Sequence, residues 1–339
     1  MRDWMKAVAV GVAAPLAVMI FIMAFMWPMA TMEPKDIPVA VVGSEEQVAQ
    51  IENAIDEQKP GLLDIERVDS RDEAQQRVEE RKADGAIVLG QQPELLVASA
   101  AGSAQAGVVK NLAEPLTAMA NKQAQAAAAA KGIPADAVPE VQVEVTDLVP
   151  FSADDPQGLG MNFVILPIAI GGLIGGAIAS FTLRRPGQRL LAVAIHAPLA
   201  GTLVAVVMGP LFGMLPGGFW ASAGVLALGI GALSSLIAGL RSVLGIGGFV
   251  LGAVFNMLFA NPLAGTMAPK EFVAGDWGAL GQHLPNGATA TLVRSVNYFP
   301  SAPIGQPVWT LLAWIAVGVC LLGVGMALGK RGAAAPSAE

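Results

Sequence analysis

Apolar residues gather in long stretches that carry no charged side chain. A helix needs about 20 apolar residues to cross about 30 Å of hydrocarbon, and five uncharged stretches of this chain hold 26 to 51 residues. The longest, 190–240, contains the turn signal Leu215-Pro216-Gly217-Gly218 and is divided there. The spans predicted in this way are 8–31, 160–183, 190–213, 219–240, 242–261 and 307–329. The pattern therefore predicts an α-helical integral membrane protein with a six-helix bundle.

Residues 32–159, between the first two spans, alternate short apolar runs with amphipathic polar segments. Predicted strands cover 38–43, 62–68, 85–89, 95–98 and 141–145, and predicted helices cover 44–58, 70–82 and 103–131. Ser44 followed by Gln47 is a capping-box pattern, Ser70 is a further N-cap, and Pro115 is expected to kink the third helix. This order favours a small α/β domain with a mixed sheet, inserted after the first span.

The distribution of charge supports this division. Charged residues make up 14% of the 339-residue chain, whereas soluble domains carry about 25%. Residues 33–157 hold 10 Lys/Arg and 23 Asp/Glu, while the other 214 residues hold 10 Lys/Arg and 4 Asp/Glu. We interpret this as one acidic, water-exposed domain joined to a membrane-embedded body.

Basic residues flank the spans on one predicted side of the membrane. They are Arg2, Lys6, Arg184, Arg185, Arg189, Arg241, Lys330 and Arg331. Because cytoplasmic loops are enriched in Lys and Arg, we expect residues 1–7 and the tail 330–339 to be cytoplasmic and 32–159 to be extracytoplasmic. A cleaved signal peptide is the alternative for span 1, but the apolar run is about twice the usual 7–15 residues and no A-x-A site follows.

The segment 262–306 mixes apolar and turn residues. We expect short or re-entrant helices here, at the outer interface. Trp277, Tyr298 and Phe299 are candidate interfacial anchors.

The chemistry within the spans is sparse. No Asp, Glu, Lys or Arg lies inside a predicted span, although proton-coupled transporters and voltage sensors depend on such residues. The P-loop pattern G-x-x-x-x-G-K-[ST] is missing, and no nucleophile–base pair is visible. The single cysteine and two distant histidines indicate no metal or other cofactor, and the acidic balance argues against nucleic-acid binding. We therefore expect a protein that is not an enzyme and that takes any energy for transport from another subunit.

A few polar residues inside the spans are candidate pathway residues: Asn162, His196 and Asn256. The alternative for His196 is a bond to a carbonyl freed by Pro198, and for the two asparagines interhelical hydrogen bonds. Four Gly-x-x-x-Gly pairs, which begin at Gly171, Gly172, Gly248 and Gly325, favour close helix packing.

The layout of one span, a large outer domain and five further spans resembles that of ABC-2-type transporter permeases, in particular the phage infection protein-like branch. Local residues are similar as well. Residues 84–89 read DGAIVL, similar to the family's "gaivip" strand. The region before span 6 is similar to its "NP … W … LPxGA … R … YF" run, through Asn261-Pro262, Trp277, Leu284–Ala288, Arg294 and Tyr298-Phe299.

This resemblance implies a multi-pass bacterial cell-membrane protein that pairs with a separate cytoplasmic ABC ATPase, usually as two permeases with two ATPases. It implies export of a hydrophobic or amphipathic substrate. It also implies ATPase contacts at residues 1–6 and at the short turn that carries Arg184, Arg185 and Arg189. The alternative for these arginines is that they only anchor the topology. The alternative function is a non-transporting scaffold, secretion accessory or receptor that acts through the outer domain.

Overall fold

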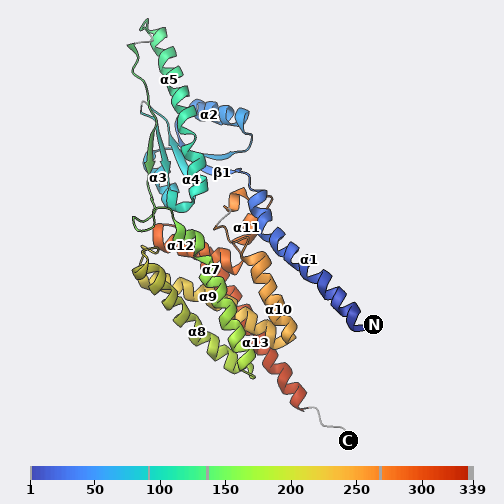
Figure 1. Cartoon of the computed structure of the whole chain (residues 1–339). Helices are drawn as coiled ribbons and strands as arrows, with labels where there is room; N and C mark the ends of the chain where they lie inside the picture. Colours follow the sequence, from blue (N-terminus) through green and yellow to red (C-terminus); the bar gives the residue numbers. More distant parts are fainter. Residues whose placement is uncertain (1, 91, 135–136, 267–268, 335–339) are drawn as a thin grey trace. The chain divides into compact units, whose positions relative to one another are not determined.

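The computed structural model describes residues 2–90, 92–134, 137–266 and 269–334. The chain forms two compact units (Figure 1). The helical unit comprises Met1–Glu33, Leu159–Val293 and Ile304–Glu339, and the sheet unit comprises Pro34–Gly158 and Arg294–Pro303. The sheet unit is therefore built from two separate pieces of chain, and the second piece comes from the segment 262–306 expected at the outer interface.

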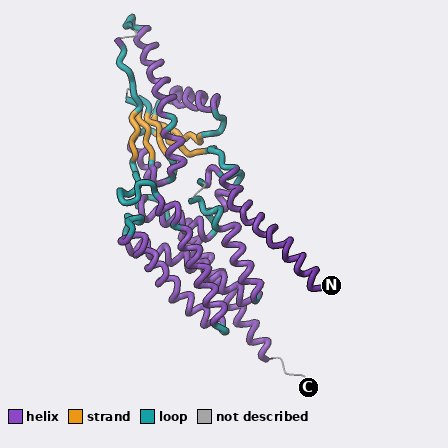
Figure 2. The backbone as a smooth tube through the Cα atoms, viewed as in Figure 1, coloured by secondary structure: helices purple, strands orange, loops and turns teal. Residues whose placement is uncertain are grey.

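Among the described residues of the helical unit, five helices are long and apolar enough to cross a membrane: Asp3–Pro28, Leu159–Thr182, Pro186–Leu211, Phe219–Leu244 and Gly305–Leu328. The elements are α1 (Arg2–Ala30), α6 (Leu159–Phe163), α7 (Ile165–Thr182), α8 (Pro186–Val206), η3 (Val207–Leu211), α9 (Phe219–Leu244), α10 (Ile246–Phe255), η4 (Asn256–Ala260), η5 (Lys270–Phe272), α11 (Trp277–Gly281), α12 (Pro285–Tyr298) and α13 (Gly305–Ala334). The η3 and η4 segments are π-helical. The protein is thus mostly helical, as a helical membrane protein is expected to be (Figure 2).

The structure differs from the sequence prediction at the fifth span. Helix α9 continues to Leu244, beyond the predicted end of the fourth span, and Gly245 then breaks it with a φ of 64°. The remaining apolar helix, Ile246–Ala260, is shorter than the length that crosses a bilayer. The fifth span is predicted from the length of an uncharged stretch. This length does not reveal the break at Gly245, because the residues after Arg241 form a continuous apolar run.

Helix α9 lies at the centre of the helical unit, and 78% of the residues in its most apolar 18-residue stretch are buried. Small residues let its neighbours approach closely. A Cβ at Gly172 of α7 would lie 2.5 Å from the Leu233 side chain, one at Gly201 of α8 2.5 Å from the Ala227 backbone, and one at Gly318 of α13 2.4 Å from the Ser235 backbone. The predicted close packing is therefore found within the chain, around one helix.

The sheet unit contains a five-stranded sheet in the order β2-β1-β3-β4-β5. The sheet is mixed, as the sequence predicts. Its elements are β1 (Ile37–Val42), α2 (Glu45–Gln58), β2 (Leu63–Val68), α3 (Arg71–Glu79), β3 (Gly85–Val88), β4 (Glu94–Val97), η1 (Ser99–Ala101), α4 (Ser103–Lys110), α5 (Ala113–Ala130) and β5 (Glu144–Asp147). Strands β2, β1 and β3 are parallel, β4 is antiparallel to β3, and β5 is parallel to β4. Ala86 packs in one core cluster with Ala74 of α3, and a Cβ at Gly85 would touch Val109 of α4. The two helices therefore cover opposite faces of the sheet.

The predicted helix 103–131 is wrong as a single element, because the structure divides it into α4 and α5 at Asn111-Leu112. Pro115, in the first turn of α5, favours this break. It has no N–H to donate to the carbonyl of Asn111, four residues earlier, and its ring crowds that carbonyl. Asn111 and Leu112 therefore form a turn between α4 and α5. The sequence indicates only a kink at Pro115.

The last strand also differs from the prediction, since β5 covers Glu144–Asp147 rather than 141–145. The side chain of Asn121 on α5 binds both backbone groups of Val141, with distances of 2.8 and 2.9 Å. Thr117 Oγ1 accepts the N–H of Val143 at 3.3 Å. These residues therefore bond to α5 and not to the sheet.

Phe299 is 1% exposed and belongs to a core cluster of the sheet unit. Arg81 lies 5.5 Å from the centre of its ring and donates from Nη1 to Ser295 Oγ at 3.0 Å. Tyr298 packs edge-on against Phe151, and burial raises the pKa of its phenol. The expectation that Tyr298 and Phe299 anchor the chain at a membrane interface is therefore wrong for Phe299, whose ring is enclosed, while Trp277 is 44% exposed.

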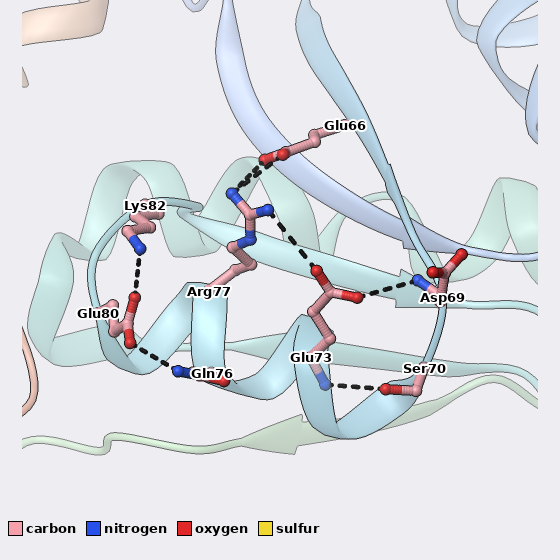
Figure 3. A network of polar contacts seen from close by, with 8 residues as sticks. All are labelled: Glu66, Asp69, Ser70, Glu73, Gln76, Arg77, Glu80 and Lys82. Atoms are coloured by element: carbon pink, nitrogen blue, oxygen red, sulfur yellow. Dashed lines mark hydrogen bonds and ion pairs between the residues drawn. The ribbon is translucent and has the colours of Figure 1, made fainter.

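Polar side chains fix the first turns of α2 and α3 as the sequence predicts. The Ser44 capping box with Gln47 is complete. Ser70 Oγ accepts the Glu73 N–H at 3.2 Å, and Glu73 accepts the Asp69 N–H (Figure 3). Arg77 adds an ion pair to Glu66 at 2.9 Å across to β2. These are exposed contacts, so they set the direction of α3 more than they add stability.

Glu94 joins three elements of the sheet unit. Its carboxylate accepts from Arg71 Nε at 2.7 Å and Nη2 at 2.9 Å, and from Thr146 Oγ1 of β5 at 2.7 Å. Hydrogen bonds from Arg71 lower the pKa of the Glu94 carboxyl below its ordinary value. The charged form of Glu94 is therefore the one that holds α3 and β5 to β4.

Gly318→Leu is expected to destabilise the helical unit, whereas Gly323→Leu is not. Gly318 abuts the Ser235 backbone, but a Cβ at Gly323 of the same helix would meet nothing within 4 Å. Overpacking of this kind costs about 1–3 kcal/mol. The thermal unfolding of the two purified variants in detergent measures the difference, and equal transitions would refute the close contact of α13 with α9.

The stability of the sheet unit is expected to fall in acid more steeply in the wild type than in Glu94→Gln. Because the folded pKa of Glu94 is lowered, its contribution is present above the unfolded value of about 4.3 and is lost as the pH falls through the folded value. Pulse proteolysis of the full chain in urea, from pH 7 to pH 3, gives the midpoints. Glu140→Gln, at an exposed position, should keep the wild-type slope.

Candidate functional site

Asn256 is buried in the helical unit and pairs with a residue that the sequence analysis did not single out as a polar candidate. Asn286 Nδ2 donates to Asn256 Oδ1 at 3.1 Å, and the two side chains are 0% and 1% exposed. Asn286 lies in the first turn of α12, and Asn256 is the first residue of the π-helix η4. Asn256 thus makes a hydrogen bond between two helical elements, with a partner from outside any predicted span.

The pair leaves one donor and one acceptor unused. Asn256 Nδ2 and Asn286 Oδ1 are buried and have no hydrogen-bond partner within the described structure. An unpaired buried polar group costs about 1–3 kcal/mol, so the pair carries a penalty that a further polar group would relieve. A water molecule, a hydroxyl or an amide could accept from the one and donate to the other.

A mostly apolar pocket of about 300 Å³ is formed by the same π-helical segment. Leu258 and Phe259 of η4 line it together with Ala24 and Trp27 of α1. Trp277 closes one side, edge-on to Trp27 at 6.1 Å between ring centres. π-helical segments occur frequently at functional sites, and this one contributes to both the pocket and the amide pair.

His196 binds a backbone carbonyl of another helix. Its Nε2 lies 3.0 Å from the oxygen of Gly171 in α7, whereas the alternative to a pathway role was a carbonyl freed by Pro198 within its own helix. The ring fits because position 175 is glycine, where a Cβ would lie 2.2 Å from the imidazole. His196 therefore joins α8 to α7.

Asn162 lies in the short helix α6 and is half-buried. No hydrogen bond connects its side chain with His196 or Asn256 in the described parts of the chain. The three predicted pathway residues are therefore not brought into one polar cluster, and only Asn256 combines burial with unsatisfied capacity.

Arginines gather at one end of the helical unit. The buried guanidinium of Arg189 donates to Ser242 Oγ of α9 at 2.8 Å and to the carbonyl oxygens of Leu183 and Ser180 at 3.0 and 3.2 Å. Arg241 of α9 lies 5.8 Å from the centre of the Phe181 ring of α7. Arg184 and Arg185 are exposed on the turn between α7 and α8. Arg189 thus holds this turn in place, whereas the exposed side chains of Arg184 and Arg185 make no comparable contact with the described helices.

A serine, a lysine and an aspartate meet in the sheet unit, which the sequence analysis did not foresee. Asp147 accepts from both the N–H and the hydroxyl of Ser99, and Lys110 Nζ donates to Ser99 Oγ at 3.0 Å and pairs with Asp147 at 3.6 Å. A lysine that activates serine as a base has to be in its neutral form. Here the exposed lysine is paired with a carboxylate, so the cluster acts as a clamp between η1, α4 and β5.

No group of three or more His, Cys, Asp or Glu side chains among the described residues is placed to hold a metal ion. Comparison of the chain with known protein families, with curated proteins and with solved structures gives no match.

Asn286→Leu is expected to destabilise the protein by about 1–3 kcal/mol, because it leaves the buried Asn256 amide without its partner. Asn256→Leu/Asn286→Leu should cost less than the sum of the single changes, since it removes both stranded groups. Thermal unfolding in detergent gives the double-mutant cycle.

Asn162→Leu is the matched control and should have little effect. Strictly additive costs would show that the two amides do not interact.

Proposed function

We propose that this protein is the transmembrane permease subunit of an ATP-driven ABC-2-type exporter, energised by a separate cytoplasmic ATPase. The observation that carries the proposal is the exposed Arg184–Arg185 pair, held on a turn that the buried Arg189 fixes at the end of the helical unit. Rigid, charged surfaces suit partners of opposite charge, because they steer and orient the encounter.

The composition of the long helices supports an external source of energy. The central parts of α1, α7, α8, α9 and α13 carry no Asp, Glu, Lys or Arg, namely residues 7–30, 165–182, 190–206, 219–240 and 305–329. Ion-coupled pumps use such residues as relays. The polar groups buried there are neutral or bonded to the backbone, as His196 is.

The pocket beside η4 supports a hydrophobic or amphipathic substrate. Its lining by Trp27, Phe259 and Leu258 suits an apolar body, while the amides of Asn256 and Asn286 are buried nearby in the chain and do not line it. Ligand sites typically combine such an apolar lining with a small number of polar groups.

The proposal extends to topology. Both termini and the arginine-rich end face the cytoplasm of a bacterial cell, following the bias of basic residues, and the sheet unit is extracytoplasmic. Ile246–Ala260, π-helical end included, is the fifth helix of a six-helix bundle and enters the membrane without reaching the full length of a span. Two copies of the permease pair with two ATPases, as the resemblance to ABC-2 permeases implies.

Affinity purification of the chain from membranes of its own host, in a mild detergent, is expected to recover an ATPase subunit. Arg184→Glu/Arg185→Glu should lose this subunit, whereas Arg184→Lys/Arg185→Lys should keep it, because the surface charge is unchanged. Lys122→Glu/Lys131→Glu, an equal double charge reversal at exposed positions of the sheet unit, is the control.

Inside-out vesicles should then take up a fluorescent amphiphile only with ATP and with the retained ATPase. If the purified chain without any ATPase transported the probe, or itself hydrolysed ATP, the proposal would be overturned. Loss of partner proteins after removal of the sheet unit, with no transport in any preparation, would point to the scaffold or receptor function.

A further inference from the structure

A cleft in the sheet unit has the form of a small ligand site. It lies between α2 and the α4–α5 turn and has a volume of about 300 Å³. Its walls are mostly apolar and include Ile55, Leu62, Leu112, Leu116 and Met119. This volume is at the lower end of the range for small-molecule sites.

The cleft lies beside the break between α4 and α5, and Asn111, Leu112 and Pro115 form part of its lining. Leu112 and Leu116 remain 8% and 6% exposed at the base, so the cleft has a packed floor.

The rim of the cleft carries polar groups that the protein itself does not use. Lys59, Gln58 and Asn111 line it, and none of these side chains forms a hydrogen bond or ion pair with another described residue. The nearby carboxylate of Asp56 accepts the N–H of Gly61 at 3.2 Å and does not line the cleft. Lys59 is the one charged residue in the described lining of the cleft, and no carboxylate lines it, so the local charge there favours a negatively charged group.

We propose that this cleft binds a single-chain amphipathic anion, with its apolar body between α2 and α5 and its carboxylate at Lys59. At roughly 30 Å³ per non-hydrogen atom, as in liquid water, the cleft holds about ten such atoms. This is one short acyl chain, and a two-chain phospholipid does not fit. The site goes beyond the proposed export function, since it is defined without reference to ATP or to an ATPase.

Photolabelling of the full-length chain in nanodiscs tests the site, with a diazirine-bearing decanoate as the probe. Peptide mapping is expected to place the label in Ala54–Leu62 and Val108–Met119. Unlabelled decanoate should compete, whereas decyltrimethylammonium and two-chain phosphatidic acid should not, because the first has the wrong charge and the second is too large.

Lys59→Glu should weaken labelling by about fivefold, the effect of losing an exposed ion pair of about 1 kcal/mol. Lys59→Arg and the distant Lys131→Glu should label as the wild type does. Ala54→Trp should fill the cleft and abolish labelling, and Asn53→Trp, at an exposed position on the same helix, is its control for folding.

Equal labelling of wild type and Lys59→Glu, label spread over the whole sheet unit, or competition by the cationic amphiphile would each overturn the proposal. Occupation of the cleft by another polypeptide, trapped by the same residues while decanoate fails to label, would also overturn it. Because no ATP or ATPase is present, a negative result here leaves the export proposal standing.

Discussion

The close approach of helix backbones to α9 is the constraint on which the helical unit depends. Gly172, Gly201 and Gly318 meet α9 where no larger side chain fits. Packing of this kind replaces the hydrophobic effect, which does not operate between helices in lipid. The polar contacts depend on it in turn. Arg189 in the first turn of α8 reaches Ser242 in the last turn of α9, and Thr289 of α12 packs directly on Gly229 of α9.

Local signals predicted much of this fold. The uncharged stretches located the long helices, and Ser44 and Ser70 marked two helix starts, because an N-cap acts within four residues. The sequence did not reveal the α4–α5 break or the position of β5. Pro115 permits both a kink and a break, and the choice depends on tertiary contacts. Val141 and Val143 alternate like a strand, yet Asn121 and Thr117 capture their backbone from a distant helix.

The candidate site was predictable only in part, for a related reason. An amide inside an apolar stretch needs a hydrogen-bond partner, and this requirement singled out Asn256. Its partner Asn286 lies in a segment that contains other polar residues, so nothing in the sequence distinguishes it. Likewise, Arg184, Arg185 and Arg189 look equivalent in sequence. Only the folded chain separates the buried Arg189, which joins helices, from its exposed neighbours, which remain open to another protein.

The two-piece construction of the sheet unit has a consequence for biosynthesis. The core cluster that contains Ala98, Ala100 and Ala101 is completed by Phe299 and Ala302, which belong to Arg294–Pro303. A ribosome reaches that segment only after it has translated α6 to α11. The hydrophobic core of the sheet unit therefore stays incomplete while the apolar helices are synthesised. A fragment cut at residue 158 would retain this gap permanently, and a soluble version of the unit needs residues 294–303 grafted back.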